Sequence, residues 1–395
     1  MRFDPPHCPY TDGPCGKTTS FQYQRRGTFR RRCDGRDVQR YACKGCRRTF
    51  SIQTFRFDHR LKRPSLSEEI LHDFVSKVTQ RQTARERKCT LRTVALRLVR
   101  MGGHCRRFHE RQLRLHSRGL PWSGGFQLDE LETYEHNRRL KPLTVPVLVH
   151  GPSYCVLHTA VGTLPARKPL SEDNQAKLAE LEKREGKRVS ESRVKVDECF
   201  SRLAGVAAHL PVVHVKTDKK SSYATLLQQH FGQRLAHRTT SSKVPKDCKN
   251  PLFAINLTLA MLRDGSSRLV RRTWAVSKKR FALEHHLWVW IAWRNYVRVI
   301  TNRNRRQSAA MAAGIIDRKL DISDILRWRV FEDFPHSQGR QNPYQTTRNA
   351  FVPLKVALGQ KPGDGSRKKA CTTAASPLPG GVEPMTEIGV SPRPG

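Results

Sequence analysis

Acidic residues and long hydrophobic runs are both scarce in this chain of 395 residues. It has 34 Asp and Glu against 74 Lys and Arg, which gives a formal net charge of +40 at pH 7. A compact protein of this charge repels itself unless an anionic partner is near. A polyphosphate is the expected partner, because neutralised phosphates release counterions; a membrane surface is the alternative. No apolar run approaches the ~20 residues of a transmembrane helix, so we expect no membrane span.

The first residues also lack the apolar stretch of a secretory signal. Met1 is followed by the charged and proline-containing segment 2–6. We therefore expect a cytoplasmic protein, whose 11 cysteines lie in a reducing environment. In that compartment cysteines are more often metal ligands or free thiols than disulfides.

Composition predicts an α+β chain with several domains. Residues 1–60 are rich in cysteine, arginine and aromatic side chains, and 62–118 have the pattern of basic helices. Strand-like and helix-like runs alternate in a third domain over 126–335, which is expected to end in a basic helical extension. Residues 359–395 are rich in Gly, Pro, Ser and Thr, which predicts a disordered tail.

The first domain has the cysteine spacing of a small zinc ribbon. A CxxC knuckle at 43–46 follows a wider cysteine pair at 8–15. Zinc prefers four tetrahedral thiolate or imidazole ligands, and a β-rich segment this small needs the metal to fold. The predicted ligands of a structural Zn²⁺ are Cys8, Cys15, Cys43 and Cys46. Cys33 or His7 is an alternative ligand, and a set of free cysteines is the alternative interpretation.

Residues 67–100 have the pattern of a helix-turn-helix. Ser67 is expected to cap a first helix that runs to about Val78. A short helix over 79–86 precedes a third helix over 90–100, which is expected to lie in the major groove of DNA. The side chains expected to point outward and contact DNA are Arg92, Thr93, Arg97 and Arg100. A basic helical hairpin is the alternative, but the basic outward face favours DNA binding.

The third domain has an order of elements that predicts an α/β, RNase H-like fold. The expected elements are strands over 126–134, 143–149 and 154–161, helices over 172–185 and 191–209, a strand over 212–218 and a helix over 223–231. In that architecture an acid of the first strand and an acid ending the fourth share a pocket with two divalent cations about 3.5–4 Å apart. Asp129 and Asp218 fill these positions, and Mg²⁺ suits their oxygen ligands. Alternatively, Asp129 pairs with an arginine and Asp218 caps the next helix.

Several motifs in combination resemble those of bacterial insertion-sequence transposases with a zinc ribbon, a helix-turn-helix and a DDE-type nuclease domain. These motifs are RRTFS at 47–51, QLDELET at 127–133, TDKKSSY at 217–223, NLTLAMLR at 256–263, RLVRRTWAVSKK at 268–279 and WIAWRNY at 290–296. The resemblance covers about residues 8–298. It implies an enzyme that binds the terminal inverted repeats of double-stranded DNA, works as a homo-oligomer, and cuts and joins strands with Mg²⁺ or Mn²⁺. It further implies association with the bacterial nucleoid.

The resemblance implies that Asp129 and Asp218 are the first two catalytic acids. In many relatives a Glu precedes the Asn-Leu-Thr block, whereas Phe253 occupies that place here. Some related transposases use Asn as the third ligand. The candidates for this ligand are, in order, Asn256, Glu284 and Asp264. If none reaches the pocket, the chain is a catalytically decayed, transposon-derived DNA-binding protein.

A basic block over 263–280 follows these acids, and we expect it to hold phosphates of the DNA end. Its expected DNA-binding residues are Arg268, Arg271, Arg272, Lys278 and Lys279. The tryptophans at 288, 290 and 293 are expected in the core rather than on a base-stacking surface. An RNA-binding ribbon protein is a third interpretation, which has the charge but no recognisable RNA-binding module.

Overall fold

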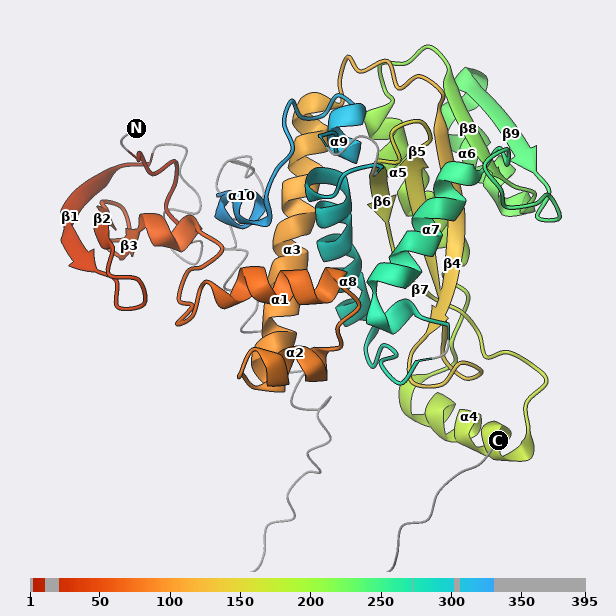
Figure 1. Cartoon of the computed structure of the whole chain (residues 1–395), viewed down its shortest axis with the longest axis horizontal. Coiled ribbons are helices and arrows are strands. Elements are labelled where there is room, and N and C mark those ends of the chain that lie inside the picture. Colours follow the sequence, from red (N-terminus) through yellow and green to blue (C-terminus); the bar gives the residue numbers. More distant parts are fainter. Residues whose placement is uncertain (1–2, 11–20, 272, 302–305, 330–395) are drawn as a thin grey trace, which may run out of the picture. The chain divides into compact units, whose positions relative to one another are not determined.

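The computed structural model describes residues 3–10, 21–271, 273–301 and 306–329. The chain is an α+β protein with a small antiparallel sheet, a larger mixed sheet and packed helices (Figure 1). The tail predicted at 359–395 and the end of the third domain, 330–335, lie outside the described residues. None of the helices in the described ranges is long and apolar enough to cross a membrane.

The small sheet has three antiparallel strands in the order β1-β2-β3. Its elements are β1 (Tyr23–Arg30), β2 (Asp37–Cys43), β3 (Thr49–Ser51) and the 3-10 helix η2 (Ile52–Phe55). Tyr41 of β2 lies opposite Phe50 of β3, and their rings stack with centroids 5.6 Å apart. Phe55 meets Phe50 edge to face at 6.1 Å. A few aromatic rings therefore supply most of the apolar contact in this part of the chain.

Three helices follow, as predicted, with some different bounds. They are α1 (Leu66–Val75), α2 (Gln80–Glu86) and α3 (Leu91–His116). The prediction that Ser67 caps α1 is wrong: Ser65 holds the N-cap position. Ser67 lies within the first turn, where its hydroxyl accepts a hydrogen bond from Arg97 at 2.6 Å. Thr79 caps α2, because its side chain accepts the N–H of Gln82.

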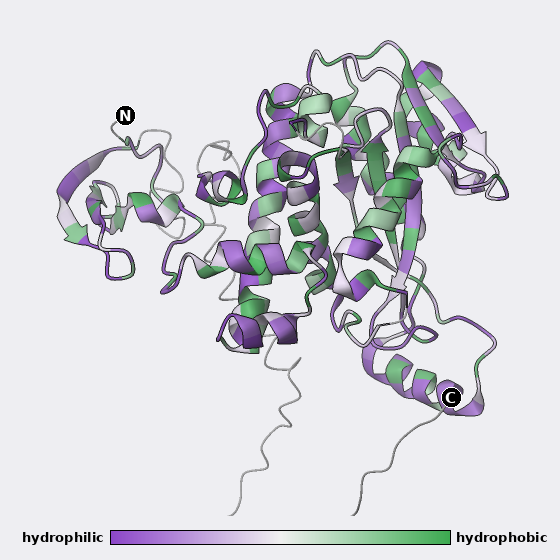
Figure 2. Ribbon diagram, viewed as in Figure 1, coloured by the Kyte–Doolittle hydropathy of each residue, from purple (hydrophilic) through white to green (hydrophobic). Residues whose placement is uncertain are grey.

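The third helix is much longer than the predicted 90–100. It begins as expected, where the Thr90 hydroxyl accepts the N–H of Thr93 at 3.2 Å. It continues to His116 because its apolar side packs against α8 (Arg280–Ala292). Figure 2 shows the corresponding alternation of hydrophilic and hydrophobic bands along α3. Gly102 allows the close crossing, since a Cβ there would lie 2.4 Å from the Cβ of His285.

The larger sheet has strand order β6-β5-β4-β8-β9, with β7 paired to β5. Its strands are β4 (Phe126–Tyr134), β5 (Pro142–His150), β6 (Val156–Thr159), β7 (Gly162–Thr163), β8 (Val213–Asp218) and β9 (Leu235–Thr240). β4 is antiparallel to β5 and parallel to β8, and β8 is parallel to β9. The predicted strands are therefore present, and β7 and β9 are additional ones. β5 is buried along its whole length, as expected for a strand covered on both faces.

Helices pack on both faces of this sheet. The remaining helices are α4 (Glu172–Glu185), α5 (Ser192–Val206), α6 (Ser221–Phe231), η3 (Gly232–Arg234), α7 (Phe253–Gly265), η4 (Ser267–Leu269), the π-helical turn η5 (Trp293–Val297), α9 (Ala309–Ala312) and α10 (Ile322–Arg327). α7 contacts β4 and β5, and α5 contacts β5, β6 and β7 (Figure 1). Trp288 and Trp290 are each 1 % exposed and Trp293 is half-buried, which confirms that this cluster belongs to the core.

Candidate active site and metal centre

The two predicted catalytic acids lie on neighbouring parallel strands. Phe126 of β4 is level with Val215 of β8, and Gln127 is level with Lys216. Continued by two residues, this register brings Asp129 level with Asp218. Residues opposite each other on parallel strands point to the same face. The two carboxylates therefore share one face at the end of β8.

The electrostatics agree with this proximity. Burial raises the pKa of Asp129, and the negative charge of Asp218 raises it further. The N–H of Glu130, which donates to Asp129 Oδ1 at 2.7 Å, and the nearby charge of Lys246 act in the opposite direction. The Lys220 N–H donates to Asp218 Oδ1 at 3.1 Å, so this acid also closes the turn before α6. The alternative expectation that Asp218 caps this helix is wrong, because Lys220 holds the N-cap position of α6 and Asp218 lies two residues before it.

Helix α7 covers the face that carries the acid pair. The Gln127 side chain accepts the N–H of Ile255 and donates to the carbonyl of Pro251, both at 3.0 Å. This clamp holds the first turn of α7 against β4, two residues before Asp129. Asn256 follows Ile255 directly and is half-buried. Of the three predicted third ligands, Asn256 therefore lies on the helix turn that is fastened next to the pair.

The other two candidates are committed to ion pairs elsewhere. The Asp264 side chain is 85 % exposed and pairs with Lys77, which follows α1, at 3.4 Å. The Glu284 carboxylate accepts a hydrogen bond from Arg106 of α3 at 3.1 Å. These partners belong to the helical layer formed by α1, α3 and α8. The neighbouring Arg263 lines a pocket together with Glu132 of β4.

Glu130 is the centre of a buried polar network that the sequence analysis did not predict. Its side chain is 10 % exposed and lies on the face of β4 opposite to Asp129. Its carboxylate accepts hydrogen bonds from four side chains, namely Thr144 at 2.5 Å, Ser192 and Tyr223 at 2.7 Å, and Lys220. Burial alone would raise the pKa of Glu130, but these donors lower it, so the carboxylate is charged. The network joins β4 to β5, α5 and the turn that carries Asp218.

A basic pocket lies at the end of β4, beyond Asp129. It has a volume of about 230 Å³ and is lined by Glu132, Thr133, Tyr134, Arg138, Arg167, Arg263, Leu269, Val270 and Arg271. Burial and the charge of Arg271 lower the pKa of Arg263, while Asp129 and Glu132 oppose this shift. Arg263 is therefore close to both the acids and the pocket. Glu132 is paired with Arg167, which leaves the pocket strongly cationic.

The predicted DNA-binding residues of the basic block are only partly at the surface. Arg271, Lys278 and Lys279 are exposed, as expected, and Arg272 lies outside the described residues. Arg268 is 8 % exposed, so its expected surface position is wrong. It lies in η4, where the turn after α7 folds inward, and burial lowers its pKa to about 10.

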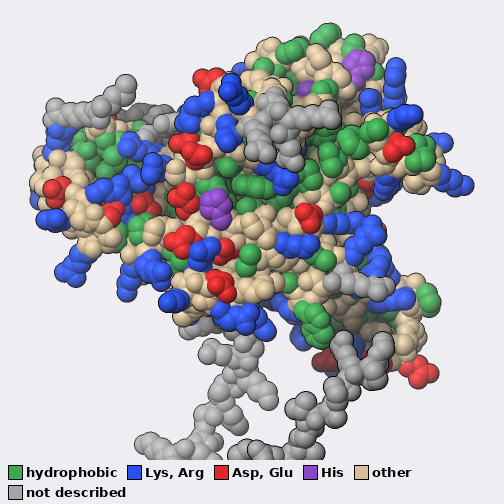
Figure 3. All heavy atoms as spheres, in the orientation of Figure 1, with side chains coloured by type: hydrophobic (Ala, Val, Ile, Leu, Met, Phe, Trp, Pro, Cys, Tyr) green, Lys and Arg blue, Asp and Glu red, His purple; other side chains and the backbone are tan. Residues whose placement is uncertain are grey.

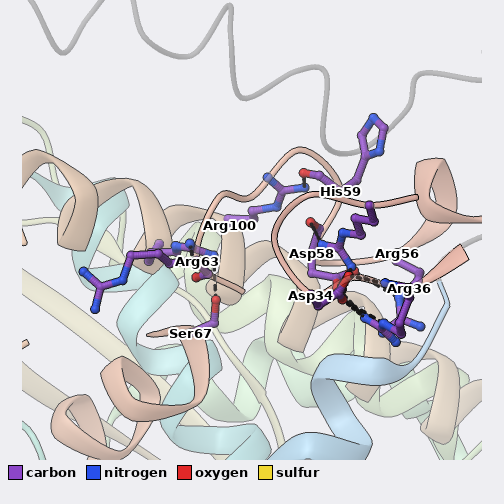
Figure 4. Close-up of polar contacts among 10 residues, drawn as sticks. Asp34, Arg36, Arg56, Asp58, His59, Arg63, Ser67 and Arg100 are labelled. Atoms are coloured by element: carbon purple, nitrogen blue, oxygen red, sulfur yellow. Dashed lines mark hydrogen bonds and ion pairs between the residues drawn. The ribbon is translucent and has the colours of Figure 1, made fainter. Parts of the chain in front are cut away.

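Of the four predicted contacts on α3, Arg97 points into the protein and Arg100 is half-buried and bound to the backbone. Arg97 is 5 % exposed and donates to the Ser67 hydroxyl at 2.6 Å and to the carbonyl of Arg63 at 2.8 Å. The expectation that Arg97 points outward is wrong, because it lies one turn after the buried Val94 and reaches one acceptor before α1 and one in its first turn. Arg100 donates to the carbonyl of His59 at 2.9 Å, as Figure 4 shows.

The start of α3 keeps the remaining two residues accessible. Arg92 is exposed and Thr93 is half-buried. The Thr93 hydroxyl also lies 3.0 Å from that of Thr90, so it contributes to the helix cap. The DNA-contacting surface predicted for α3 is thereby reduced to its first turn.

A cluster of ion pairs fastens the β1–β2 hairpin to the segment that leads into α1. Arg31 donates to Asp58 Oδ2 at 2.8 Å, and Arg56 donates to Asp58 Oδ1 at 3.0 Å (Figure 4). Burial would raise the pKa of Asp58, but the two arginines lower it overall. Asp34 pairs with both Arg31 and Arg36. Sequence patterns gave no signal for this cluster, since its members are separated by up to 27 residues.

Three of the four predicted zinc ligands are gathered at one point. The sulfur atoms of Cys8, Cys43 and Cys46 all lie within 4.8 Å of one another, and Cys8 Sγ is 3.6 Å from Cys46 Sγ. Cys43 ends β2, and the turn is closed by its N–H donating to the carbonyl of Arg48 at 3.0 Å. Cys15, the fourth predicted ligand, lies outside the described residues. Two buried thiols and one half-buried thiol so close together form a soft donor set that suits a thiophilic metal ion.

The alternative ligands are placed elsewhere. Cys33 is exposed in the β1–β2 connection. The His7 ring packs edge to face against Phe55, with centroids 5.3 Å apart. Within the described part of the chain, the cluster of possible metal ligands therefore contains neither of them.

Comparison with models of known protein families and with curated proteins gives no match to this chain.

Proposed function

We propose that the chain is a DNA transposase with a DDE-type, RNase H-like nuclease domain. The observation that carries this proposal is the pair Asp129 and Asp218 on adjacent parallel strands, beneath α7. The strand order, with three antiparallel strands followed by two parallel ones, supports the RNase H-like assignment. The motifs that resemble transposases include both acids and the clamped start of α7. The function would require double-stranded DNA as partner and a homo-oligomer that brings two element ends together.

The acid pair fits a divalent metal. Burial raises the pKa of Asp129 and the charge of Asp218 raises it further, and a divalent cation bound between the two carboxylates would offset their repulsion. Asp129 and Asp218 would hold Mg²⁺ or Mn²⁺, with the side-chain oxygen of Asn256 as a neutral third ligand. The bound metal supplies Lewis-acid stabilisation of the phosphodiester oxygens and activates water or the freed 3′-hydroxyl.

The protein's own residues have separate tasks in this proposal. Glu130 and Lys220 fix the turn that carries Asp218, and Gln127 fixes the start of α7. Arg263 and Arg271 attract the phosphate backbone to the pocket at the end of β4. Lysine and arginine side chains are spread over the visible face in Figure 3, which suits non-specific contact with DNA.

The amino-terminal part would place the nuclease on the element ends. Cys8, Cys43 and Cys46, with Cys15 as the proposed fourth ligand, would hold a structural Zn²⁺. The first turn of α3 would contact DNA through Arg92 and Thr93. We further propose that the protein acts in the bacterial cytoplasm at the nucleoid.

The decisive test is strand cleavage of a plasmid that carries the gene with its flanking DNA. Asp129→Ala should lower the cleavage rate by about 10³-fold or more in Mg²⁺, because several kcal/mol of transition-state stabilisation is lost. Binding to the same DNA should be unchanged. Asp264→Asn is the matched control, because its carboxylate is exposed and paired with Lys77, and this variant should cut at the wild-type rate. Wild-type cleavage by Asp129→Ala would eliminate the nuclease assignment.

A decayed, transposon-derived DNA-binding protein is the second candidate. It is motivated by Phe253 in place of the expected Glu and by the ion pairs that occupy Asp264 and Glu284. Mn²⁺ binding, followed by electron paramagnetic resonance, separates the two. The transposase should bind Mn²⁺ and lose it in Asp218→Ala, and Asn256→Ala should weaken it. If the wild-type protein binds duplex DNA but does not bind Mn²⁺ and does not cut DNA, the chain is the decayed form.

A further inference from the structure

Trp274 is fully exposed, in contrast to other tryptophans of the chain. Its relative exposure is 100 %, whereas Trp122, Trp288 and Trp290 are 4 % exposed or less. Trp293 and Trp328 are half-buried. A tryptophan carries a large apolar surface, about 150–250 Å², that is favourable to bury. The position of Trp274 therefore favours contact with a partner rather than a role in folding.

The loop that carries Trp274 is anchored at both ends. Leu269 before it and Ser277 after it are 3 % and 1 % exposed. The Ser277 carbonyl accepts the N–H of His136 at 3.1 Å, at the end of β4. Within the loop, the Thr273 hydroxyl accepts the N–H of Ala275 at 3.0 Å. The indole of Trp274 therefore projects from a loop whose two ends are buried.

The base of this loop also forms a wall of the cationic pocket described above. Leu269, Val270 and Arg271 line it together with Arg138, Arg167 and Arg263. At about 230 Å³ the pocket is smaller than the ~300–1,000 Å³ typical of small-molecule sites. Its size and charge suit a phosphate group with bound water. Glu132, Thr133 and Tyr134 of β4 line the pocket as well, so it joins the strand that carries Asp129 to the base of the Trp274 loop.

The residues around Trp274 decide which partner it suits. Arg271, Lys278 and Lys279 are exposed on the same loop. An apolar protein surface would leave these cations without compensation, whereas a nucleic-acid strand offers phosphates to them and a base to the indole. Stacking of bases on aromatic side chains beside a basic groove is a general mode of binding to single strands.

We propose that the pocket holds a phosphate of a DNA strand and that Trp274 stacks on an unpaired base of the same strand. This inference rests on the proposed function, since it places the unpaired base next to the acids that would cut the strand. It assigns the chain a preference for DNA that is locally open, rather than fully paired, at the cleavage site.

The test measures the affinity of the full-length protein for three oligodeoxynucleotide probes of one sequence. These are a single strand, a duplex with a short unpaired 3′ end, and a blunt duplex. Trp274→Leu should weaken binding to the first two by about 5- to 100-fold, the range given by stacking of one base, and leave the blunt duplex unchanged. Trp274→Phe is the matched control, because its ring can still stack, and it should recover most of the affinity. Circular dichroism checks that the variants are folded.

Two further measurements locate the contact. Because Trp274 is fully exposed, acrylamide should quench the fluorescence of this residue strongly. Binding of the unpaired strand should protect Trp274 from this quenching. Arg271→Gln should weaken all strands and reduce the slope of log affinity against log salt by about one, as expected for one phosphate contact. ATP as a competitor distinguishes a strand from a free nucleotide: the strand should remain bound when ATP is present.

Several results would overturn the inference. These are wild-type affinity of Trp274→Leu for the unpaired probes, an equal loss on the blunt duplex, or displacement of the strand by ATP at similar concentration. Tighter binding of RNA with the same sequence would overturn the assignment to DNA. Failure of the proposed nuclease is a separate outcome: Asp129→Ala should keep the Trp274-dependent preference even though it does not cut.

Discussion

The small sheet with residues 3–60 and the larger sheet with its helices are stabilised in different ways. The buried apolar cluster of the first consists of Cys8, Tyr41, Cys43, Phe50 and Phe55, so two of its members are also metal-ligand candidates. The second has a continuous core that extends to Ile325 through α1, α3, α8 and the strands, and Phe57, at the end of the first region, packs into it. A core as small as the first rarely supports a fold alone. We therefore expect the metal to stabilise the first region and apolar burial to stabilise the second.

The two candidate metal sites differ in the same way. Cys43 and Cys46 are brought together by one tight turn, so the site depends mainly on local geometry. Asp129 and Asp218 are brought together by strand register across the sheet, so their geometry depends on the packing of the whole second region. The tryptophans of the chain all lie beyond residue 60, so their fluorescence reports on the second region only.

The largest expected effect is the loss of the thiol site. Cys43→Ser should abolish binding of one metal equivalent and unfold residues 3–60, because structural zinc contributes about 10 kcal/mol or more to such modules. Zinc content by mass spectrometry and protease cleavage within 3–60 measure both effects. Tryptophan fluorescence should stay at the wild-type value. Cys33→Ser, an exposed thiol outside the cluster, is the matched control. Full zinc retention in Cys43→Ser would show that this cysteine is not a zinc ligand and that the first region does not depend on the proposed thiol site.

Loss of charge on Glu130 is expected to be the next largest effect. Glu130→Gln removes the charge of a buried carboxylate and part of a four-donor network, which should cost about 3 kcal/mol in free energy of unfolding. Urea denaturation followed by tryptophan fluorescence measures this. Glu132→Gln, two residues away with a side chain 57 % exposed, should cost less than about 1 kcal/mol. Equal effects of the two variants would contradict the role assigned to the network.

Mild acid should act mainly on the helical layer of the second region. Burial lowers the pKa of His104 and His286 to about 3 and that of His109 to about 4. Between these values and the ordinary value of 6.5, the unfolded chain binds protons that the folded chain does not. Stability is therefore full above pH 6.5 and falls as the pH falls, by about 1.4 kcal/mol per pH unit for each histidine.

Urea denaturation at pH 6.5 and 5.5 checks this slope. His109→Gln should reduce the slope of stability against pH by the contribution of one histidine. His72→Gln, which changes an exposed histidine, should leave the slope unchanged. A stability that does not change over this interval would contradict the prediction. Asp58, whose pKa is lowered, loses its contribution only at lower pH and does not affect the interval.

The smallest expected effect tests the crossing of α3 and α8. Gly102→Ala should destabilise the second region by about 1–3 kcal/mol, because its Cβ would overlap His285. Gly103→Ala is the neighbouring control. Its Cβ would approach no atom closer than 3.6 Å, so the better helix propensity of alanine should stabilise the protein by up to about 1 kcal/mol. If Gly102→Ala is as stable as Gly103→Ala, the helices do not cross as closely as described.

The sequence was most informative where a structure depends on local pattern. The strand over 126–134 and the helix over 172–185 have the predicted bounds, and the CxxC turn brings its cysteines together. Arg97 shows where local pattern fails. Its helical position was predicted correctly, but its partners Ser67 and Arg63 lie on another segment, and they turn an apparent surface cation into a buried one.

By itself, therefore, the sequence determined the excess of positive charge, most of the strands and helices, and the types of ligand available for metal. The tertiary structure decided which of these residues meet. Strand register placed Asp129 beside Asp218, and the clamp by Gln127 favoured Asn256 over Asp264. Packing also buried Arg268 and left Trp274 exposed within one short block of sequence. The physical reason is that secondary structure follows the spacing of neighbouring residues, whereas burial and proximity depend on contacts between segments far apart in the chain.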